Sequence, residues 1–244
     1  MKLEKRLVVE KGDWALALCR NPISDAELER HVAFGGGYWF LDSGWIAGHK
    51  QDMKQRTWRL HRSRFVAEQI IPRPPDRFEY LGGKIEQWHT VGSRILILGA
   101  SDSQTLYSTG EKQPRWLGDT IKAIRGLTSR PMLYRPKPTP NWDDPGIAMA
   151  GRMDVKVSTN KHLEDDLDDA WIVVGLRGTG FIHALFAGVP ICMLADFEGK
   201  AWSTPLREIE TPRRSERAPL AYDLAYREWT LAELRSGAPF RETT

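Results

Sequence analysis

Cysteines and long hydrophobic runs are scarce in this sequence. Only Cys19 and Cys192 occur, each inside an apolar stretch, so a CxxC zinc or redox motif is absent and both thiols are expected in the core. No apolar run approaches the roughly 18 residues that a spanning helix needs, and no signal-peptide core follows the charged residues 1–6. We therefore expect a cytoplasmic protein with no membrane partner.

Motifs of several common catalytic classes are also missing. The sequence contains no P-loop, no nucleophile elbow, no Ser-His-Asp signature and no metal-ligand spacing. These absences argue against phosphate-loop ATPases, serine hydrolases and zinc enzymes. We expect neither a metal nor a bound cofactor.

The sequence does contain nearly balanced charge and many tryptophans. Its 244 residues include 35 basic and 32 acidic side chains, which gives a formal net charge of +3, and 41% of the residues are hydrophobic. A chain of this size can bury a core without disulfides, and a mild positive charge is compatible with an anionic partner. Among the ten tryptophans, Trp58, Trp88, Trp116 and Trp142 are candidates to stack on a ligand ring.

Apolar runs typical of buried strands alternate with helical patterns. The runs span residues 14–18, 38–41, 95–98, 132–134, 171–174 and 190–194. Near-continuous apolar strands suit parallel sheets covered on both faces, and their alternation with helices indicates an α/β fold. We expect two small Rossmann-like halves with parallel sheets facing a cleft. The first spans residues 1–90, the second spans 91–219, and residues 220–244 form a C-terminal helix packed back on the core.

Residues 162–194 carry the most informative pattern: an acidic helix, a buried strand, a glycine-rich turn, a short helix and a second buried strand. The turn, residues 177–180 (Arg-Gly-Thr-Gly), lies where the strand passes into the N-terminus of the short helix. Unpaired backbone N–H groups and the helix dipole favour an anion there, glycines allow its close approach, and Arg177 adds positive charge. A tight strand–helix turn without a ligand is the alternative.

The order of these parts resembles the C-terminal half of GT-B glycosyltransferases and their epimerase relatives. The residues that match the family pattern are Asp169-Ala170, Val173-Val174, Thr179, Ala184-Leu185 and Gly188-Val189-Pro190. The resemblance implies a metal-independent glycosyltransferase with a GT-B-like fold. In it Arg177 would be catalytic, and Gly178, Thr179 and Gly180 would bind the phosphates of a nucleotide-sugar co-substrate.

One position departs from the family pattern. His183 stands where the family has an acidic residue that often binds the donor ribose, so the resemblance places His183 among the donor-binding residues. The departure keeps an alternative open, which is a non-catalytic nucleotide- or DNA-binding module that retained the fold.

Two further strand ends carry donor-binding candidates. Arg135 and Lys137 follow the strand at 132–134 and resemble the basic residues that GT-B enzymes use against the donor diphosphate. A solvated loop with two charges is the alternative. Gly99 and Ser101 follow the strand at 95–98 and resemble the first loop of the donor domain, where they would line the cleft.

The first half carries the acceptor-side candidates. Asp42 follows the run at 38–41 and is the candidate general base for a hydroxyl nucleophile, although an Asp that opens a turn through its own side chain is equally ordinary. Arg56, Trp58 and Arg59 belong to a basic, aromatic stretch that suits phosphate contacts and stacking on bases or sugars. A solvated basic strand is the alternative.

Segment 38–44 and the C-terminal tail resemble short phage-encoded glycosyltransferases. That resemblance makes double-stranded DNA with hydroxymethylated bases the expected acceptor and the host cytoplasm the expected location, with a surface glycan as the alternative acceptor. The sequence carries no prediction of oligomeric state.

Overall fold

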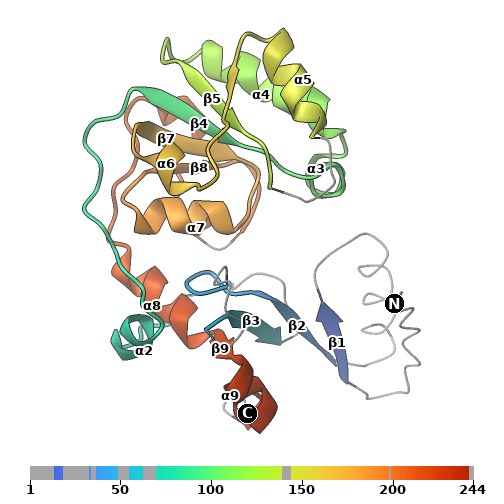
Figure 1. The fold of residues 1–244 in the computed structure, drawn as a ribbon, viewed down its shortest axis with the longest axis vertical. Helices are drawn as coiled ribbons and strands as arrows, with labels where there is room; N and C mark the ends of the chain where they lie inside the picture. Colours follow the sequence, from blue (N-terminus) through green and yellow to red (C-terminus); the bar gives the residue numbers. More distant parts are fainter. Residues whose placement is uncertain are drawn as a thin grey trace. The chain divides into compact units, whose positions relative to one another are not determined.

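The computed structural model describes residues 14–18, 33, 37–48, 55–62, 70–138, 144–197 and 199–241. The chain forms two compact units, drawn in Figure 1: unit 1 comprises Met1–Gly82 with Tyr222–Thr244, and unit 2 comprises Gly83–Ala221. The division expected from the sequence, with boundaries after residues 90 and 219, stays a prediction. The assignment of one part to the acceptor and the other to the donor stays a prediction, as does a cleft between them.

Unit 2 is built on a parallel sheet of five described strands. They are β4 (Arg94–Leu98), β5 (Met132–Arg135), β6 (Lys156–Val157), β7 (Ala170–Gly175) and β8 (Ile191–Met193). The strand order is β6-β5-β4-β7-β8, so the chain runs outward from β4 to β6 and then crosses back to β7 (Figure 1). The order therefore reverses between β4 and β7. In doubly wound sheets ligands bind at this reversal, beyond the carboxyl ends of the strands.

Helices cover both faces of this sheet. They are α3 (Asp102–Thr109), α4 (Gln113–Arg125), α5 (Pro145–Arg152), α6 (Glu164–Leu167) and α7 (Thr179–Phe186), with short 3-10 turns η1 (Lys200–Trp202) and η2 (Leu206–Glu208). Figure 1 shows α4 and α5 over one face and α7 over the other. Ile121 of α4 packs with Ile95 and Ile172 in one core cluster, and all three are fully buried. The expected α/β class and the parallel, doubly covered strands are confirmed here.

Unit 1 contains a sheet of four described strands with mixed direction. They are β1 (Trp14–Leu18), β2 (Gly37–Ser43), β3 (Thr57–Arg62) and β9 (Glu228–Thr230), in the order β1-β2-β3-β9. β1 and β2 are parallel, whereas β2–β3 and β3–β9 are antiparallel. The expectation of a parallel sheet is therefore wrong for most of this half. Tyr38 and Phe40 are buried while Trp39 and Leu41 are only half-buried, and such alternation is typical of antiparallel strands.

The C-terminal segment contains more than the single helix that we expected. It comprises α8 (Ala218–Tyr226), β9, α9 (Leu231–Ser236) and α10 (Ala238–Arg241). Thr230 caps α9, and its side chain and backbone form a capping box with Glu233. This cap starts a new helix just after β9, where Trp229 lies opposite Trp58 of β3. The segment therefore supplies an edge strand to the sheet of unit 1, which also includes α2 (Asp76–Tyr80).

The expectations drawn from scarce cysteines and short apolar runs can be compared with the structure. Cys192 in β8 is buried, as expected, and burial raises the pKa of its thiol to about 11. Cys19 lies outside the described residues. None of the helices within the described ranges is long and apolar enough to cross a membrane.

Candidate functional site

The structure brings two of the predicted donor-binding motifs to one edge of the unit 2 sheet. β4 ends at Leu98 and is followed by Gly99 and Ser101, while β7 ends at Gly175 and is followed by Arg177. β4 and β7 are adjacent parallel strands, so both loops leave the same carboxyl edge at the point where the strand order reverses. We call these two loops the switch-point loops.

The first switch-point loop is tightly packed against β5. The backbone N–H of Gly99 donates to the carbonyl of Arg135 at 2.8 Å. A Cβ at Gly99 would lie 2.6 Å from Tyr134 Oη and 3.0 Å from the Arg135 carbonyl oxygen, so only glycine fits without a shift. Ser101 caps α3, because its side chain accepts from the Gln104 N–H at 3.3 Å. The predicted contact of either residue with a donor stays a prediction.

The second switch-point loop presents backbone rather than side chains. Gly178 precedes α7 with φ of 139°, which L side chains rarely adopt. The N-cap residue of α7 is Gly178, which makes no side-chain cap hydrogen bond, in contrast to Ser101 on α3. Gly180 lies close to the end of β4, since a Cβ there would be 2.9 Å from Leu98 Cδ1. The start of α7, including Thr179, therefore offers N–H groups beside β4.

Helix α3 joins the two switch-point loops. Gln104 Nε2 donates to the Arg177 carbonyl oxygen at 3.0 Å. The Arg177 guanidinium lies over the ring of Tyr107, 5.4 Å from its centroid. Both Gln104 and Tyr107 lie on α3, so one helix positions the backbone and the side chain of Arg177 relative to the loop at Gly99.

Arg135 and Lys137 differ sharply in their surroundings. Arg135 is buried and ion-paired with the fully buried Asp166, and it also donates to the carbonyls of Asn160 at 3.2 Å and Lys161 at 3.1 Å. These contacts give the Arg135 guanidinium a structural task inside unit 2. Lys137 is exposed, and its backbone nitrogen lies 3.1 Å from the position of a Gly99 Cβ. Both residues contact the first switch-point loop through their backbone, and Lys137 is the one whose side chain is exposed.

His183 lies on α7, four residues after Thr179, so the two share one side of the helix. Its side chain is half-buried. The donor contact that the family resemblance implies for His183 stays a prediction.

A buried polar network beneath Gly99 was missed by sequence reasoning. Tyr134 Oη donates to Asp144 Oδ2 at 2.7 Å, and Gln113 Nε2 donates to Tyr134 Oη at 2.6 Å and to Asp144 Oδ1 at 2.9 Å. Asp144 also caps α5 by accepting from the Gly146 N–H at 2.8 Å. Burial, and then the bond to Asp144, raise the pKa of Tyr134, so its hydroxyl stays protonated. The network supports the wall against which Gly99 packs.

On the acceptor side, the predicted base and a predicted cation are paired with each other. Asp42 of β2 lies opposite Arg59 of β3, and Arg59 Nη2 donates to Asp42 Oδ2 at 2.6 Å. The Arg59 side chain is 6% exposed, and its guanidinium lies 5.0 Å from the ring centroid of Trp45. Arg59 is thus held inside unit 1. The catalytic role of Asp42 and the acceptor contact of Arg59 stay predictions.

The remaining tryptophan and basic candidates differ in how deeply they are buried. Arg56 and Trp58 are half-buried in unit 1. Trp116 is a core residue, so its selection as a stacking candidate is wrong, because it belongs to the apolar face of α4. The ring of Trp88 is covered by the Arg217 guanidinium, 3.8 Å from its centroid. Trp142 lies outside the described residues.

A second cluster that the sequence did not reveal surrounds Glu228 in unit 1. This fully buried carboxylate accepts N–H bonds from Trp45, from Ile46 at 2.6 Å and from Ala47 at 3.4 Å. It also accepts from the Thr57 hydroxyl. Burial raises the pKa of Glu228, and these hydrogen bonds oppose that rise. Glu228 therefore holds the turn that follows Asp42 against the C-terminal strand β9.

Within the described ranges no three His, Cys, Asp or Glu side chains are grouped so as to hold a metal ion. The chemistry available at the switch-point loops is that of backbone N–H groups, the Thr179 hydroxyl and the cations Arg177 and Lys137. Such a set binds and stabilises negative charge.

No family model and no curated protein matches this chain. Among solved structures, the chain is similar to the β-Kdo 2,7-transferase of Thermosulfurimonas dismutans KpsC, with 14% identity and a TM-score of 0.54 over 88% of this chain and 77% of that one. The β-Kdo 2,4-transferase of the same KpsC matches with 11% identity and a TM-score of 0.45, over 85% of this chain and 78% of that one. The first likeness shows that this chain shares its α/β fold with that transferase.

Proposed function

We propose that this protein transfers a sugar from a nucleotide-sugar donor to a hydroxyl of an acceptor, without a metal. The observation that carries the proposal is the meeting of the switch-point loops where the strand order reverses, with the start of α7 beside the end of β4. The likeness of the fold to a protein titled a β-Kdo transferase supports the same class of reaction.

The donor phosphates would bind at the start of α7. The positive end of the helix dipole and the N–H groups near Gly178, Thr179 and Gly180 favour the negative charge that grows on the leaving phosphate as the bond to the sugar breaks. Arg177, positioned by α3, and the exposed Lys137 add positive charge. Arg135 supports this region through Asp166 instead of binding the donor directly.

The acceptor hydroxyl needs a base, and Asp42 remains the residue that we propose. Its side chain is 29% exposed, so it is accessible, and its ion pair with Arg59 fixes its orientation. In the proposed reaction the Asp42 carboxylate takes the proton of the acceptor hydroxyl.

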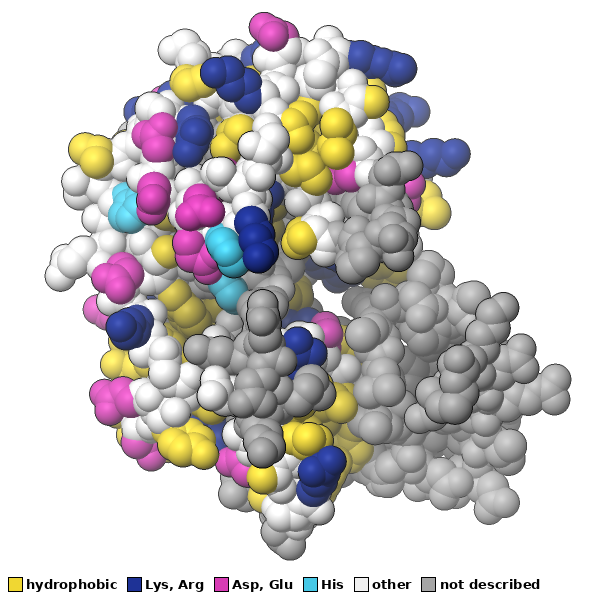
Figure 2. Space-filling model, in the orientation of Figure 1, with side chains coloured by type: hydrophobic (Ala, Val, Ile, Leu, Met, Phe, Trp, Pro, Cys, Tyr) yellow, Lys and Arg dark blue, Asp and Glu magenta, His cyan; other side chains and the backbone are white. Residues whose placement is uncertain are grey.

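A glycan is the acceptor that we favour over DNA. Arg59, one of the residues expected to contact DNA, is buried and paired with Asp42. On the described surface seen in Figure 2, acidic side chains lie among the basic ones, without one continuous basic patch on that face. Hydroxymethylated DNA is the alternative, and it predicts binding that falls steeply with added salt, whereas a neutral glycan would hardly respond.

The test is turnover across a panel of nucleoside mono- and diphosphate sugars. Arg177→Ala and Lys137→Ala should each lower kcat/KM by about tenfold or more, because they remove charge stabilisation of the leaving phosphate. Arg207→Ala is the matched control, since Arg207 is an exposed arginine on η2. Nucleotide binding without turnover of any donor would favour a non-catalytic module, and unchanged turnover in both variants would remove the assignment.

A further inference from the structure

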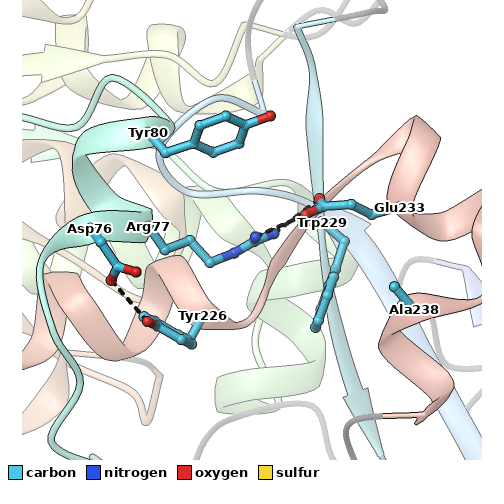
Figure 3. A pocket seen from close by; sticks show the side chains of 7 residues that line it. All are labelled: Asp76, Arg77, Tyr80, Tyr226, Trp229, Glu233 and Ala238. Carbon is cyan, nitrogen blue, oxygen red and sulfur yellow. Dashed lines mark hydrogen bonds and ion pairs between the residues drawn. The ribbon is translucent and has the colours of Figure 1, made fainter.

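Unit 1 contains a hollow of about 500 Å³ that the reaction proposed above does not use (Figure 3). Its lining comes from α2, from the end of α8, from β9 and from α9, and it includes Asp76, Arg77, Tyr80, Tyr226, Trp229 and Glu233. The volume lies within the range of about 300–1,000 Å³ that is usual for small-molecule sites. We call this hollow the aromatic pocket.

Three aromatic rings border the pocket. Tyr80 is 72% exposed, which is unusual for so large a ring in the described part of unit 1, while Trp229 is 7% exposed and fixed in β9. In the view of Figure 3 the Arg77 side chain runs between Tyr80 and Tyr226 towards Glu233. Rings that present apolar surface beside polar groups suit ligands that are apolar on one face and polar at the edge.

The two carboxylates of the pocket are both held in place, but they differ in how many hydrogen bonds they already accept. Asp76 Oδ1 accepts from Tyr226 Oη at 2.8 Å. Glu233 accepts from Arg77 Nη1 at 2.8 Å on Oε1 and from Arg77 Nη2 at 3.0 Å on Oε2, and the N–H and hydroxyl of Thr230 also donate to Oε2. A carboxylate has about four acceptor positions, so these bonds saturate Glu233, whereas Asp76 keeps lone pairs for further donors. Asp76 would therefore accept hydrogen bonds from a ligand without moving.

The arginines near the pocket already interact with other groups of the protein. The Arg77 guanidinium donates to the backbone carbonyls of Ala225 and Glu228 as well as to Glu233, and it lies 4.9 Å from the ring centroid of Trp229. Arg73 lies over Tyr226 at 5.1 Å. Because these arginines balance the two carboxylates and already occupy aromatic faces, the pocket favours neither an anion nor a second cation.

We propose that the aromatic pocket is a subsite for a neutral sugar unit. A sugar ring presents C–H groups that pack on the exposed ring of Tyr80, and its hydroxyls donate to Asp76. Its role in holding part of a glycan acceptor rests on the proposed function, whereas sugar binding itself does not. The subsite is a positioning feature, since no reacting group lies among its lining residues.

The test uses the intact protein without any nucleotide. Ligand-observed NMR would monitor neutral monosaccharides (glucose, galactose, mannose and N-acetylglucosamine) and their β-linked disaccharides. We expect at least one of them to bind at millimolar or lower concentration. Tyr80→Ala should weaken that binding about tenfold, because it removes the most exposed ring. Leu127→Ala, at an exposed apolar residue of unit 2 away from the switch-point loops, is the control and should leave it unchanged.

Asp76→Asn is the second variant, because it keeps the shape of the exposed side chain and removes its charge and one acceptor. It should also weaken sugar binding, with an unchanged melting temperature. The proposal is overturned if no sugar in the panel binds, if both variants bind as the parent does, or if tetramethylammonium displaces the sugar and binds more tightly.

The failure of this proposal is distinguishable from the failure of the proposed function. Sugar binding that responds to Tyr80→Ala in a protein that turns over no donor would keep the subsite and remove the reaction. Turnover that responds to Arg177→Ala, together with sugar binding that ignores Tyr80→Ala, would keep the reaction and remove the subsite.

Discussion

In unit 2 the candidate site is made mainly of backbone, whereas in unit 1 the polar groups of interest are side chains that hold one another. The switch-point loops present N–H groups beside Gly99 and Gly178, and each loop is encoded within a few consecutive residues. In unit 1, Glu228 reaches a turn that lies far away in the sequence, and Asp42 is paired across two strands with Arg59. A site made of backbone groups can therefore be recognised from a few consecutive residues, whereas a site made of paired side chains depends on the tertiary fold.

The largest effect is expected from replacing Glu228, which should destabilise unit 1 and leave unit 2 folded. Glu228→Ala leaves several buried donors of the turn after Asp42 without an acceptor, at about 1–3 kcal/mol for each unsatisfied group. We expect unit 1 to lose its cooperative unfolding transition while unit 2 keeps its own, as measured by denaturant titration with hydrogen exchange. Glu111→Ala, at a partly exposed carboxylate of unit 2, is the control. A stable unit 1 in Glu228→Ala would show that the turn does not depend on this carboxylate.

Replacing Gly99 would test the backbone character of the donor side. Gly99→Ala places a methyl group 2.6 Å from Tyr134 Oη, which requires a shift of the loop and costs about 1–3 kcal/mol. We expect lower kcat/KM for the nucleotide sugar together with reduced stability of unit 2. Gly151→Ala is the matched control, because no described atom lies within 4 Å of its added Cβ. Equal kinetics in the two variants would contradict a role for the packing at Gly99.

Lowering the pH should reduce the stability of unit 1 through a buried histidine. His61 is buried in β3, and burial followed by the charges of Arg59 and Arg227 lowers its pKa from 6.5 to about 3. A histidine kept neutral in the folded state takes up a proton more readily when unfolded, so unit 1 loses stability as the pH falls below about 6.5 towards 3. His61→Phe should flatten this part of the stability profile, measured by denaturant midpoints between these pH values. An unchanged profile would show that His61 gains solvent contact on protonation without unfolding.

The smallest effect is expected at the surface of unit 2. Arg115 and Glu111 form an exposed pair at 3.1 Å with i,i+4 spacing. Arg115→Ala should change the free energy of unfolding by only about 0.3–0.5 kcal/mol, less at high salt, and should leave turnover unchanged. A large loss of activity would contradict this prediction and would indicate that the donor site reaches well beyond the switch-point loops.

Several features were predictable because they depend on neighbouring residues. The apolar strands at 95–98, 132–134 and 171–174 and the glycine-rich turn at Arg177 were recognised from local pattern, and the structure places them in one parallel sheet. The antiparallel pairing of unit 1 was not, because the apolar run at 38–41 hides an alternation of burial that only its partner strand creates. The sequence also predicted that Arg59 contacts DNA, because the pattern of basic residues does not show that Arg59 forms an ion pair with Asp42.

The sequence by itself determined the α/β class, four of the five described strands of unit 2 and the position of the turn before α7, since hydrophobic periodicity and glycine placement act over a few residues. Only the tertiary structure decided which buried polar side chains are hydrogen-bonded to each other. Glu228 with the turn after Asp42, Tyr134 with Asp144 and Gln113, and the aromatic pocket all join segments that are distant in the chain. Burial makes an unpaired polar group costly, so these partners are selected by what the fold brings within hydrogen-bonding distance.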